Sequence, residues 1–444
     1  MTTAAATWRT ELRPTLVLAG PIVLAQVAHM SMGVVDTLVA GRIGTVALAG
    51  LGLAANFFWT FTHVCVGGLM ALDTFFAQSV GARDERGLAR YFAQSFWLCA
   101  AVTVLSAVVL FLGNWLYVSV AAPSPTREAF GIYLRNVIWC LPAIYFFFAL
   151  QRYWQARQRV VAFMAFTVLA NGLNLLVNLA LGLGWWGFPR LEVQGLALAS
   201  VASRYALLVA GMVYTAWRMR RFSLWLPRID REVQRRFLGL GLPAAGQAAS
   251  EVGVFVIATF LMGVFSTVAL AAHHVCLIMA AFTFMFPMGL SAAAAVRVGT
   301  FVGAGQPARA RLAGWLCIGL SMLVMAGFAA GYVVFPRTLL GWFSDDPEVL
   351  AIGAKILLVV ALFQVADGTQ VSATGALRGW GNTRAAMIAN LIGHYPIGLV
   401  LGLVLGFGLG WGAVGVWVGL AAGLIAVAVM VLWVWRSLTA AATD

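Results

Sequence analysis

The sequence predicts an all-α polytopic membrane protein whose twelve transmembrane helices form two six-helix lobes, the second a repeat of the first. Hydrophobic residues make up 62% of the 444 residues, charged residues only 10%, and the mean hydropathy is +0.93. A soluble domain of this size does not have enough interior for such a composition. A repeat at half the chain length and a series of long apolar segments point to the same fold class.

The repeat is visible as identical residues at one spacing. The matches separated by 222 residues are TVALA at 45–49 and 267–271, Pro21 and Pro243, and VGA at 80–82 and 302–304. Several matches in one register indicate an internal duplication. Duplicated hydrophobic halves are a common design of secondary transporters, with the substrate path between the halves.

Apolar segments long enough to cross a bilayer supply the helices, six in each half. In the N-terminal half we expect them at 14–38, 47–72, 91–113, 128–150, 160–184 and 192–217. In the C-terminal half we expect them at 236–264, 270–296, 311–335, 349–375, 384–407 and 413–436. No small-residue cleavage site follows the first segment, so we expect it to remain as a helix.

Basic residues set the predicted orientation. Arginines are frequent before the first segment and after the even-numbered segments, and rare after the odd-numbered ones. The positive-inside rule therefore places both termini in the cytoplasm. Because each half holds an even number of helices, both halves insert the same way up and the repeat is parallel. The net charge of +13 then reflects topology and contact with anionic membrane lipids, and we expect no nucleic-acid partner.

One long polar connection, at 218–235, divides the chain into a predicted N-terminal lobe at 1–217 and a predicted C-terminal lobe at 236–444. The connection is either a hinge or a tether with an amphipathic stretch on the membrane surface, and we favour the tether. The sequence holds no Walker A loop and no catalytic or metal-ligand constellation. We therefore expect neither an enzyme nor a cofactor.

Three acidic residues, Asp36, Glu251 and Asp367, lie inside apolar segments. Inserting a charged side chain at the bilayer centre costs at least about 2.5–3.5 kcal/mol of free energy. A structural or functional role is therefore expected for each of the three acids. For Asp36 one interpretation is a structural ion pair with Arg42. Glu251 and Asp367 have no basic residue nearby in the sequence, and unpaired acids at this depth are typical of proton or sodium sites. We predict that the three acids couple transport to H⁺ or Na⁺, with Glu251 and Asp367 as the candidate Na⁺ ligands.

Four amides are candidates for lining a polar cavity: Gln26 and Gln247, in the first segment of each half, and Asn174 and Asn178 in the fifth segment. The two asparagines are four residues apart and share one helix face. They either join helices by hydrogen bonds or lend carbonyl oxygens to a cation beside Asp36.

Asp73, Pro21 and Pro243 are candidates for other reasons. Asp73 lies near the predicted cytoplasmic end of the second segment, where pairing with loop arginines and a transport role are equally good interpretations. The two prolines interrupt the first helix of each half. Proline removes a backbone hydrogen bond and favours a kink, so both helices are candidate bending elements.

These residues belong to longer motifs that resemble the multidrug and toxic compound extrusion (MATE) family over essentially the whole chain. The motifs are LAGPIVLAQ at 18–26, AQSVGARD at 77–84, GLPAAGQAASE at 241–251, VGAGQPARARLAG at 302–314, ADGTQVSATGALRGWGNTR at 366–384 and WGAVGVWVG at 411–419. The run at 366–384 is the most specific of them. The resemblance implies the MATE/MOP-type fold, a V-shaped cavity between two lobes, and export of cationic or amphipathic drugs against an inward H⁺ or Na⁺ gradient.

The resemblance extends to single positions. Asp36 matches the N-lobe acid of the family, and Glu251 and Asp367 match the C-lobe acids of its NorM-like bacterial branch. Asn178 matches the second polar position of helix 5, where many relatives have aspartate, so it is a departure that weakens the case for an ion site wholly in the N-lobe. Asp73 resembles an acidic helix-2 position of eukaryotic members.

We therefore expect a monomeric, cation-coupled multidrug efflux antiporter of the bacterial inner membrane, which exchanges organic cations for H⁺ or Na⁺ by alternating access. The alternative is a lipid-linked precursor flippase of the same superfamily, which would need a strongly cationic cavity. Arg204 is the only arginine that the predicted boundaries place well inside a helix, so we expect an acidic cavity. The acids do not follow the repeat, because Asp36 matches Ala258 and Glu251 matches His29 at a spacing of 222. We therefore expect the better-supported ion site in the C-terminal lobe.

Overall fold

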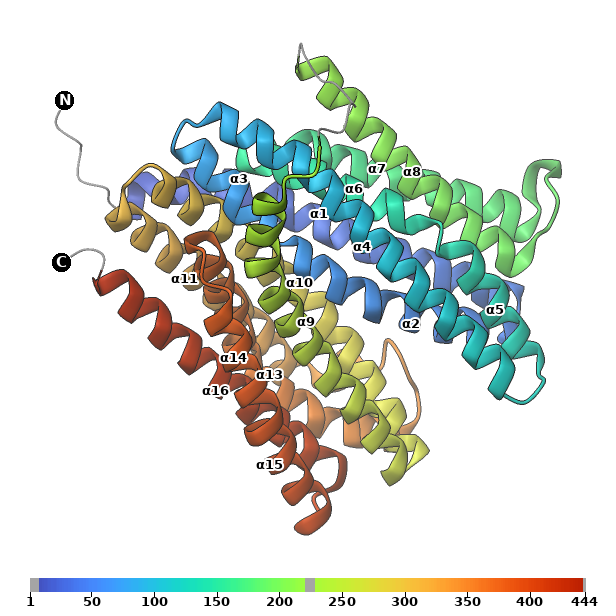
Figure 1. The fold of residues 1–444 in the computed structure, drawn as a ribbon. Helices are drawn as coiled ribbons and strands as arrows, with labels where there is room; N and C mark the ends of the chain where they lie inside the picture. The colour runs from blue at the N-terminus through green and yellow to red at the C-terminus, as the bar shows by residue number, and fades with distance from the viewer. Residues whose placement is uncertain (1–7, 220–227, 442–444) are drawn as a thin grey trace. The chain divides into compact units, whose positions relative to one another are not determined.

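The computed structural model describes residues 8–219 and 228–441, which form helices and their connections without any strand (Figure 1). Eleven helices in this part of the chain are long and apolar enough to cross a membrane. Two shorter helices, α5 and α6, meet at a bend of 43° and make a twelfth span if they are counted as one. The predicted all-α membrane protein is confirmed. Within the predicted linker at 218–235, residues 220–227 lie outside the described residues.

The helices follow one another with short connections. The first half holds α1 (Trp8–Ile43), α2 (Thr45–Leu69), α3 (Ala71–Gly81), α4 (Glu85–Val120), α5 (Pro125–Val137), α6 (Cys140–Ala156), α7 (Val161–Val177), the π-helix η1 (Asn178–Gly182), the short 3₁₀-helix η2 (Trp185–Gly187) and α8 (Glu192–Arg218). The second half holds α9 (Arg231–Phe265), α10 (Thr267–Gly303), α11 (Pro307–Val334), α12 (Pro336–Leu340), α13 (Pro347–Trp380), α14 (Arg384–Ile392), the π-helix η3 (Gly393–Leu399), α15 (Val400–Leu403), the π-helix η4 (Val404–Gly408) and α16 (Gly412–Ala441).

Local sequence explains several helix ends. The side chain of Ser266 caps α10 by accepting a hydrogen bond from the backbone N–H of Ala269 at 3.0 Å. Asp346 caps α13 in the same way, accepting from the N–H of Glu348 at 2.8 Å. At the other end of α13, Gly381 has a φ of 97°, a left-handed conformation that glycine adopts without steric cost. Polar N-caps and a C-terminal glycine therefore fix where these long helices begin and end.

The backbone carries the same repeat as the sequence. Left-handed residues occur in pairs at spacings of 222, 223 and 220 residues, which are Arg83 (φ 56°) with Gly305 (φ 67°), Gln158 (φ 57°) with Gly381 (φ 97°), and Glu192 (φ 50°) with Gly412 (φ 57°). In these three pairs the second half has glycine and the first half does not, whereas a further pair at a spacing of 223, Gly187 (φ 82°) and Gly410 (φ 73°), has glycine in both halves. The turns are thus duplicated, although their residue types have diverged.

The described residues fall into two compact units. The N-terminal unit comprises Leu24–Leu72 and Glu85–Gly239. The C-terminal unit comprises the chain from Leu240 onward, Asp73–Asp84, and α1 up to Val23. The division therefore cuts α1 just after Pro21 and α9 shortly before Pro243. The lobe boundaries predicted from the linker stay a prediction.

In the C-terminal unit, α13 packs against α10, α11 and α16 (Figure 1). Trp417 of α16 is fully buried, and its ring stacks on Phe363 of α13 at 5.9 Å with an interplanar angle of 10°. Glycines allow α13 to approach α10 closely, because a Cβ at Gly379 would lie 2.5 Å from the carbonyl oxygen of Ala295. The polar face of α13 is therefore held in place by close helix packing.

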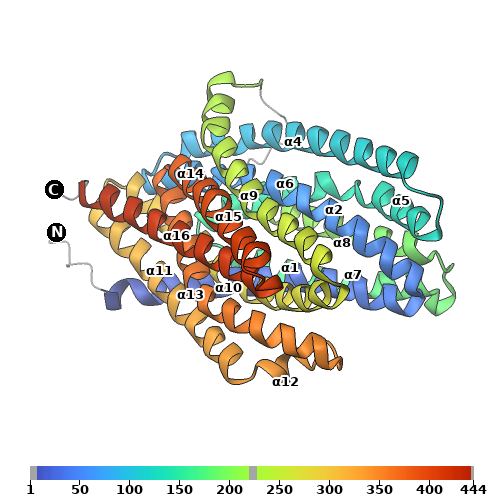
Figure 2. The ribbon, with the colours of Figure 1, turned by 90° about the horizontal axis from the view of Figure 1, so that it is seen from below.

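In the N-terminal unit, α8 packs against α5, α6 and α7, and α4 packs along α6 (Figure 2). Buried aromatic rings fill the space between these helices, among them Tyr145, Tyr153 and Phe163. The hydroxyl of Tyr145 lies 2.9 Å from that of Ser106, so its polar end is satisfied inside the apolar core. This unit holds the first group of candidate site residues.

Candidate functional site

Asp36 of α1 is buried, with 5% of the residue exposed, and its carboxylate accepts hydrogen bonds from two neutral side chains. The side-chain amide of Asn178 donates to one carboxylate oxygen at 2.6 Å, and the hydroxyl of Ser200 donates to the other at 2.7 Å. No ion pair among the described residues joins Asp36 to Arg42, which is exposed. The carboxylate is thus solvated by protein dipoles rather than neutralised by a cation at contact distance.

Two asparagines, Asn174 of α7 and Asn178 of η1, form one hydrogen-bonded chain with Asp36, and Asn171 bonds separately to α1. Asn178 also donates to the side-chain oxygen of Asn174 at 3.1 Å, and Asn171 donates to the carbonyl of Ala28 at 2.7 Å. Asn178 begins the π-helix η1, and single π-turns are frequent at functional sites. The predicted proximity of Asn174 and Asn178 to Asp36 is present in the structure. Their roles in transport stay predictions.

Ser200 beside Asp36, and His29 and Arg204 near it, were not predicted as site residues; Arg204 was noted only as an arginine inside a predicted helix. Ser200 and Arg204 are one turn apart on α8, so they share a face. Arg204 lies 3.0 Å from the Nδ1 atom of His29, which precedes Asp36 by two turns of α1. A lone serine or histidine in an apolar segment gives no signal by itself, and only the packing of α1 on α8 brings these groups together.

Glu251 of α9 and Asp367 of α13 lie within electrostatic range of each other in the C-terminal unit. The side-chain amide of Gln370 lies 3.4 Å from Asp367 and also interacts with Glu251. No ion pair among the described residues involves either acid. The structure therefore brings together two predicted acids that are 116 positions apart in the sequence, with one amide between them.

Polar side chains extend along α13 beside Asp367. Gln364 donates to the hydroxyl of Thr283 at 2.7 Å, while its own side-chain oxygen and that of Gln370 are buried with no hydrogen-bond donor in the described structure. Buried amide oxygens normally find a donor. Oxygens without one, next to two carboxylates, form an oxygen-rich donor set of the kind that alkali and other hard cations prefer.

Asp73 lies in an ion pair. Its carboxylate is 3.2 Å from the Nε atom of Arg378, and the two side chains are only 1% and 7% exposed. Next to the pair, the hydroxyl of Thr74 donates to the carbonyl of Arg378 at 2.5 Å, and Gln78 donates to that of Gly379 at 3.1 Å. Asp73 thus pairs with an arginine, as one of its two interpretations proposed, but the partner lies in the last turn of α13 and not in a loop, and the pair fastens α3 to the end of α13.

A second buried charge cluster was not anticipated. Glu11 of α1 is buried and forms ion pairs with Arg297 of α10 and Arg309 of α11, the latter at 2.7 Å. The expectation that Arg204 is the only arginine well inside a helix is wrong, because α6, α10 and α13 continue past the predicted apolar segments. Buried arginines also lie in these helices, namely Arg152, Arg297 and Arg378.

The remaining candidates have less distinctive surroundings. Gln26 and Gln247 are both half-buried, in α1 and α9. Pro21 and Pro243 lie inside α1 and α9, so the chain continues as helix through both prolines. A cavity-lining role for the amides and a kink at the prolines stay predictions.

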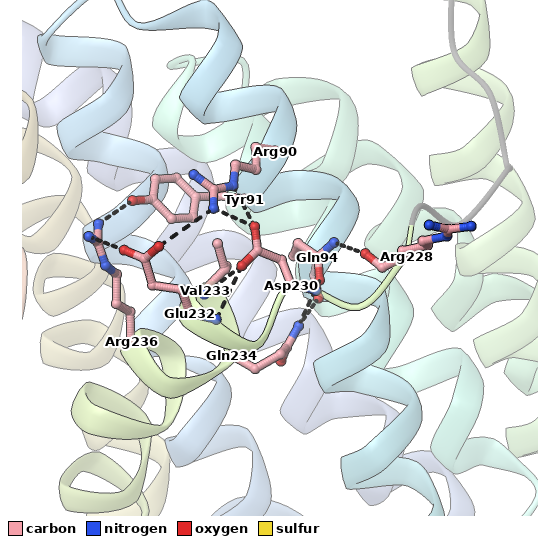
Figure 3. A network of polar contacts seen from close by, with 9 residues as sticks. All are labelled: Arg90, Tyr91, Gln94, Arg228, Asp230, Glu232, Val233, Gln234 and Arg236. Atoms are coloured by element: carbon pink, nitrogen blue, oxygen red, sulfur yellow. Dashed lines mark hydrogen bonds and ion pairs between the residues drawn. The ribbon is translucent and has the colours of Figure 1, made fainter.

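A polar network joins the start of α9 to α4 within the N-terminal unit (Figure 3). Asp230 accepts from the Nε atom of Arg90 at 2.7 Å, and this hydrogen bond lowers the pKa of Asp230 below its ordinary value. Gln94 accepts from the backbone N–H of Asp230 at 3.0 Å and donates to the carbonyl of Arg228 at 2.9 Å. The N-terminal end of α9 is therefore joined to α4 by an ion pair and by side-chain hydrogen bonds to the backbone.

Comparisons with known proteins agree with this fold and with the repeat. The profile of the MatE family matches residues 21–180 and again residues 243–404. The two matches begin 222 residues apart, which is the spacing of the sequence repeat.

Bacterial relatives match most of the chain. A protein of Rhodopseudomonas palustris called "Probable multidrug resistance protein NorM" is 37% identical over 399 residues, which cover 88% of this chain and 84% of the relative. A protein of the same name from Pseudomonas putida is 35% identical over 399 residues, covering 88% and 86%.

Solved structures share the fold at lower identity. The eukaryotic MATE transporter AtDTX14 has a TM-score of 0.89 at 20% identity, with 98% of each chain covered. A mutant of the Vibrio cholerae MATE transporter VcmN has a TM-score of 0.88 at 16% identity, also with 98% of each chain covered. The chain belongs to the MatE family, in its NorM-like bacterial branch.

Proposed function

We propose that this chain is a cation-coupled multidrug efflux antiporter, which expels cationic or amphipathic organic compounds in exchange for H⁺ or Na⁺. The observation that carries the proposal is the proximity of Glu251 and Asp367, with Gln370 between them, inside helices long enough to span a membrane; within the described part of the chain, no arginine or lysine forms an ion pair with either acid. Two carboxylates that share a site cannot both stay charged there without a bound cation or proton.

Competition for these carboxylates supplies the coupling. An inward-moving H⁺ or Na⁺ that occupies Glu251 and Asp367 removes the negative charge that would otherwise hold an organic cation. The drug is then released, and the ion-loaded protein is biased toward the opposite conformation. Coupling between two ligands requires this kind of difference in affinity between states. Asp36, held by Asn178 and Ser200, supplies the acid of the N-terminal unit.

The names of the relatives support drug export as the physiological role. We infer a location in the bacterial inner membrane, both termini in the cytoplasm, a monomer as the working unit, and two lobes that alternate access around Pro21 and Pro243. The buried arginines do not favour the flippase alternative, because Arg297 and Arg378 are paired with Glu11 and Asp73, and Arg204 by itself, near the carboxylate of Asp36, does not make the strongly cationic cavity that a pyrophosphate needs.

Efflux from proteoliposomes tests the proposal. Ethidium-loaded vesicles receive either an inward Na⁺ gradient or an inward H⁺ gradient, so that the coupling ion is read directly. We expect the Glu251→Gln/Asp367→Asn double variant to lose gradient-driven efflux. The matched control is Asp345→Asn/Glu348→Gln, which removes two charges at the exposed start of α13 and should leave efflux unchanged. A Glu251→Gln/Asp367→Asn variant that expels ethidium at the wild-type rate contradicts the proposal.

A further inference from the structure

Arg204 of α8 lies inside the N-terminal unit and has no part in the ion exchange proposed above. The residue is 8% exposed, and its one hydrogen bond to the described residues runs from Nη1 to His29. No ion pair connects it to an acidic residue in the described part of the chain. Two other buried arginines, Arg297 and Arg378, are each paired with a carboxylate, and Arg152 donates to the side-chain oxygen of Gln155. The guanidinium of Arg204 is therefore unusual in keeping most of its N–H donors unused.

His29 does not neutralise this charge. Arginine stays protonated in proteins and can only donate hydrogen bonds. The Nδ1 atom of His29, 3.0 Å away, must therefore be the acceptor, which requires a neutral imidazole with its proton on Nε2. The contact satisfies one N–H and orients the guanidinium, but it leaves a full positive charge in the interior.

A negative group lies one helical turn away. Ser200 and Arg204 share a face of α8, and Ser200 donates to the carboxylate of Asp36 at 2.7 Å. One turn of helix advances by about 5.4 Å. The unit therefore presents a carboxylate and a guanidinium side by side along α8, without their forming an ion pair with each other.

An aromatic face completes the arrangement. The guanidinium carbon of Arg204 lies 5.2 Å from the centre of the Trp59 ring, and Trp59 remains 40% exposed. A flat aromatic ligand can lie against the exposed part of such a ring, and the stacked arginine stays available to its substituents.

We propose that Arg204 is a carboxylate-binding, specificity-determining residue of the N-terminal unit, which holds the carboxylate of an aromatic substrate while the cationic group of that substrate lies toward Asp36. Arginine forms two parallel charge-assisted hydrogen bonds to a carboxylate, which makes it selective for planar anions. The proposal rests on the proposed transport function and adds to it the residue that recognises a substrate carboxylate.

A pair of dyes that differ by one methyl ester tests this directly. Rhodamine 110 carries an ionised carboxylate, and rhodamine 123 is its methyl ester, with the same cationic ring system. Fluorescence anisotropy gives the Kd of each dye for the full chain in nanodiscs. We expect Arg204→Gln to weaken rhodamine 110 binding by about ten- to a hundredfold, the range for a lost charged hydrogen bond, and to change rhodamine 123 binding less than about twofold.

Two further variants separate recognition from folding. Arg218→Gln removes the same charge from the exposed end of α8 and should leave both Kd values unchanged. Arg204→Lys keeps the positive charge but lacks the planar guanidinium group. It should give an intermediate loss of affinity for rhodamine 110 and leave the affinity for rhodamine 123 unchanged. If Arg204→Gln does not fold, the Kd values of the two dyes for Arg204→Lys decide the test. An equal loss for both dyes in either Arg204 variant would mean a structural role and overturn the proposal, as would no loss for rhodamine 110.

Efflux of the two dyes distinguishes this proposal from the function on which it rests. If wild-type protein expels neither dye under either ion gradient, the transport function itself fails. If it expels rhodamine 123 and the Arg204 variants treat the two dyes alike, transport stands and only the carboxylate subsite is wrong.

Discussion

Replacing Asp73 by asparagine would leave the guanidinium of Arg378 buried beside a neutral amide. The two side chains are 1% and 7% exposed and 3.2 Å apart, so little water screens them. Breaking a buried ion pair by removing one partner costs about 3–5 kcal/mol, because the other charge stays desolvated. We therefore expect Asp73→Asn to lower the free energy of unfolding by this amount, with a fall of several degrees in the melting temperature.

The double variant Asp73→Asn/Arg378→Gln removes both charges and should recover at least half of that loss, because no uncompensated charge remains. A maleimide dye that reacts with the buried thiols of Cys99, Cys276 and Cys317 on unfolding reports the melting temperature. A double variant that is stable and still expels ethidium assigns Asp73 a structural role. If Asp73→Asn is as stable as wild type, or if the double variant is stable but inactive, the structural reasoning is refuted.

Three further outcomes can be checked in the same melting assay. Gly375→Ala should destabilise the protein by several kcal/mol, because its Cβ would overlap the Ser291 carbonyl, whereas Gly319→Ala, with no atom within 4 Å, should stabilise α11 by about 0.5–1 kcal/mol. The backbone is left-handed at both Gln158 and Gly381, a conformation that costs a residue other than glycine about 1–2 kcal/mol. Gln158→Gly should therefore raise the melting temperature, and Gly381→Gln should lower it, each by the equivalent of this free energy. Shifts of the two variants in the same direction would contradict this reasoning. In the folded state the pKa of Asp230 lies below its ordinary value of 3.8. The ionised carboxylate therefore stabilises the fold fully at pH values above 3.8, and this stabilisation is lost as the pH falls through the folded-state pKa. Melting curves from about pH 6 to pH 3 should therefore fall less steeply for Asp230→Asn than for wild type.

The apolar segments and the repeat were enough to predict the fold class, because hydrophobic length and spacing are properties of the sequence alone. Helix ends were harder to predict. The predicted segment at 47–72 breaks near Met70 and continues as α3, and the helices that hold Arg152, Arg297 and Arg378 extend beyond their apolar runs. A helix need not end where its hydrophobic residues end, since its backbone hydrogen bonds can continue in polar surroundings.

Charge partners were the least predictable feature. The partners of Glu11 lie 286 and 298 positions away, and that of Asp73 lies 305 positions away, so no local pattern could indicate them. Glu251 and Asp367 were identified because an acid in a long apolar segment is conspicuous by itself. Arg204 was identified as unusual, but the contrast with Arg297 and Arg378, which each pair with a carboxylate, could be recognised only from the structure.

The duplication explains the scaffold but not the chemistry. Left-handed turns recur in both halves at spacings near 222, so the two copies still share a backbone plan. In three of these turns glycine is present only in the second copy, which shows that the copies have been free to diverge. Their interiors have diverged further: the C-terminal unit holds two acids around one amide, whereas the N-terminal unit holds one acid and an unpaired arginine about one turn apart. Two acids favour a small cation, and an acid beside an arginine favours a larger ligand that carries both charges. A division of labour, with the ion exchanged mainly in the C-terminal copy and the substrate's charges recognised mainly in the N-terminal copy, is the arrangement that this asymmetry supports.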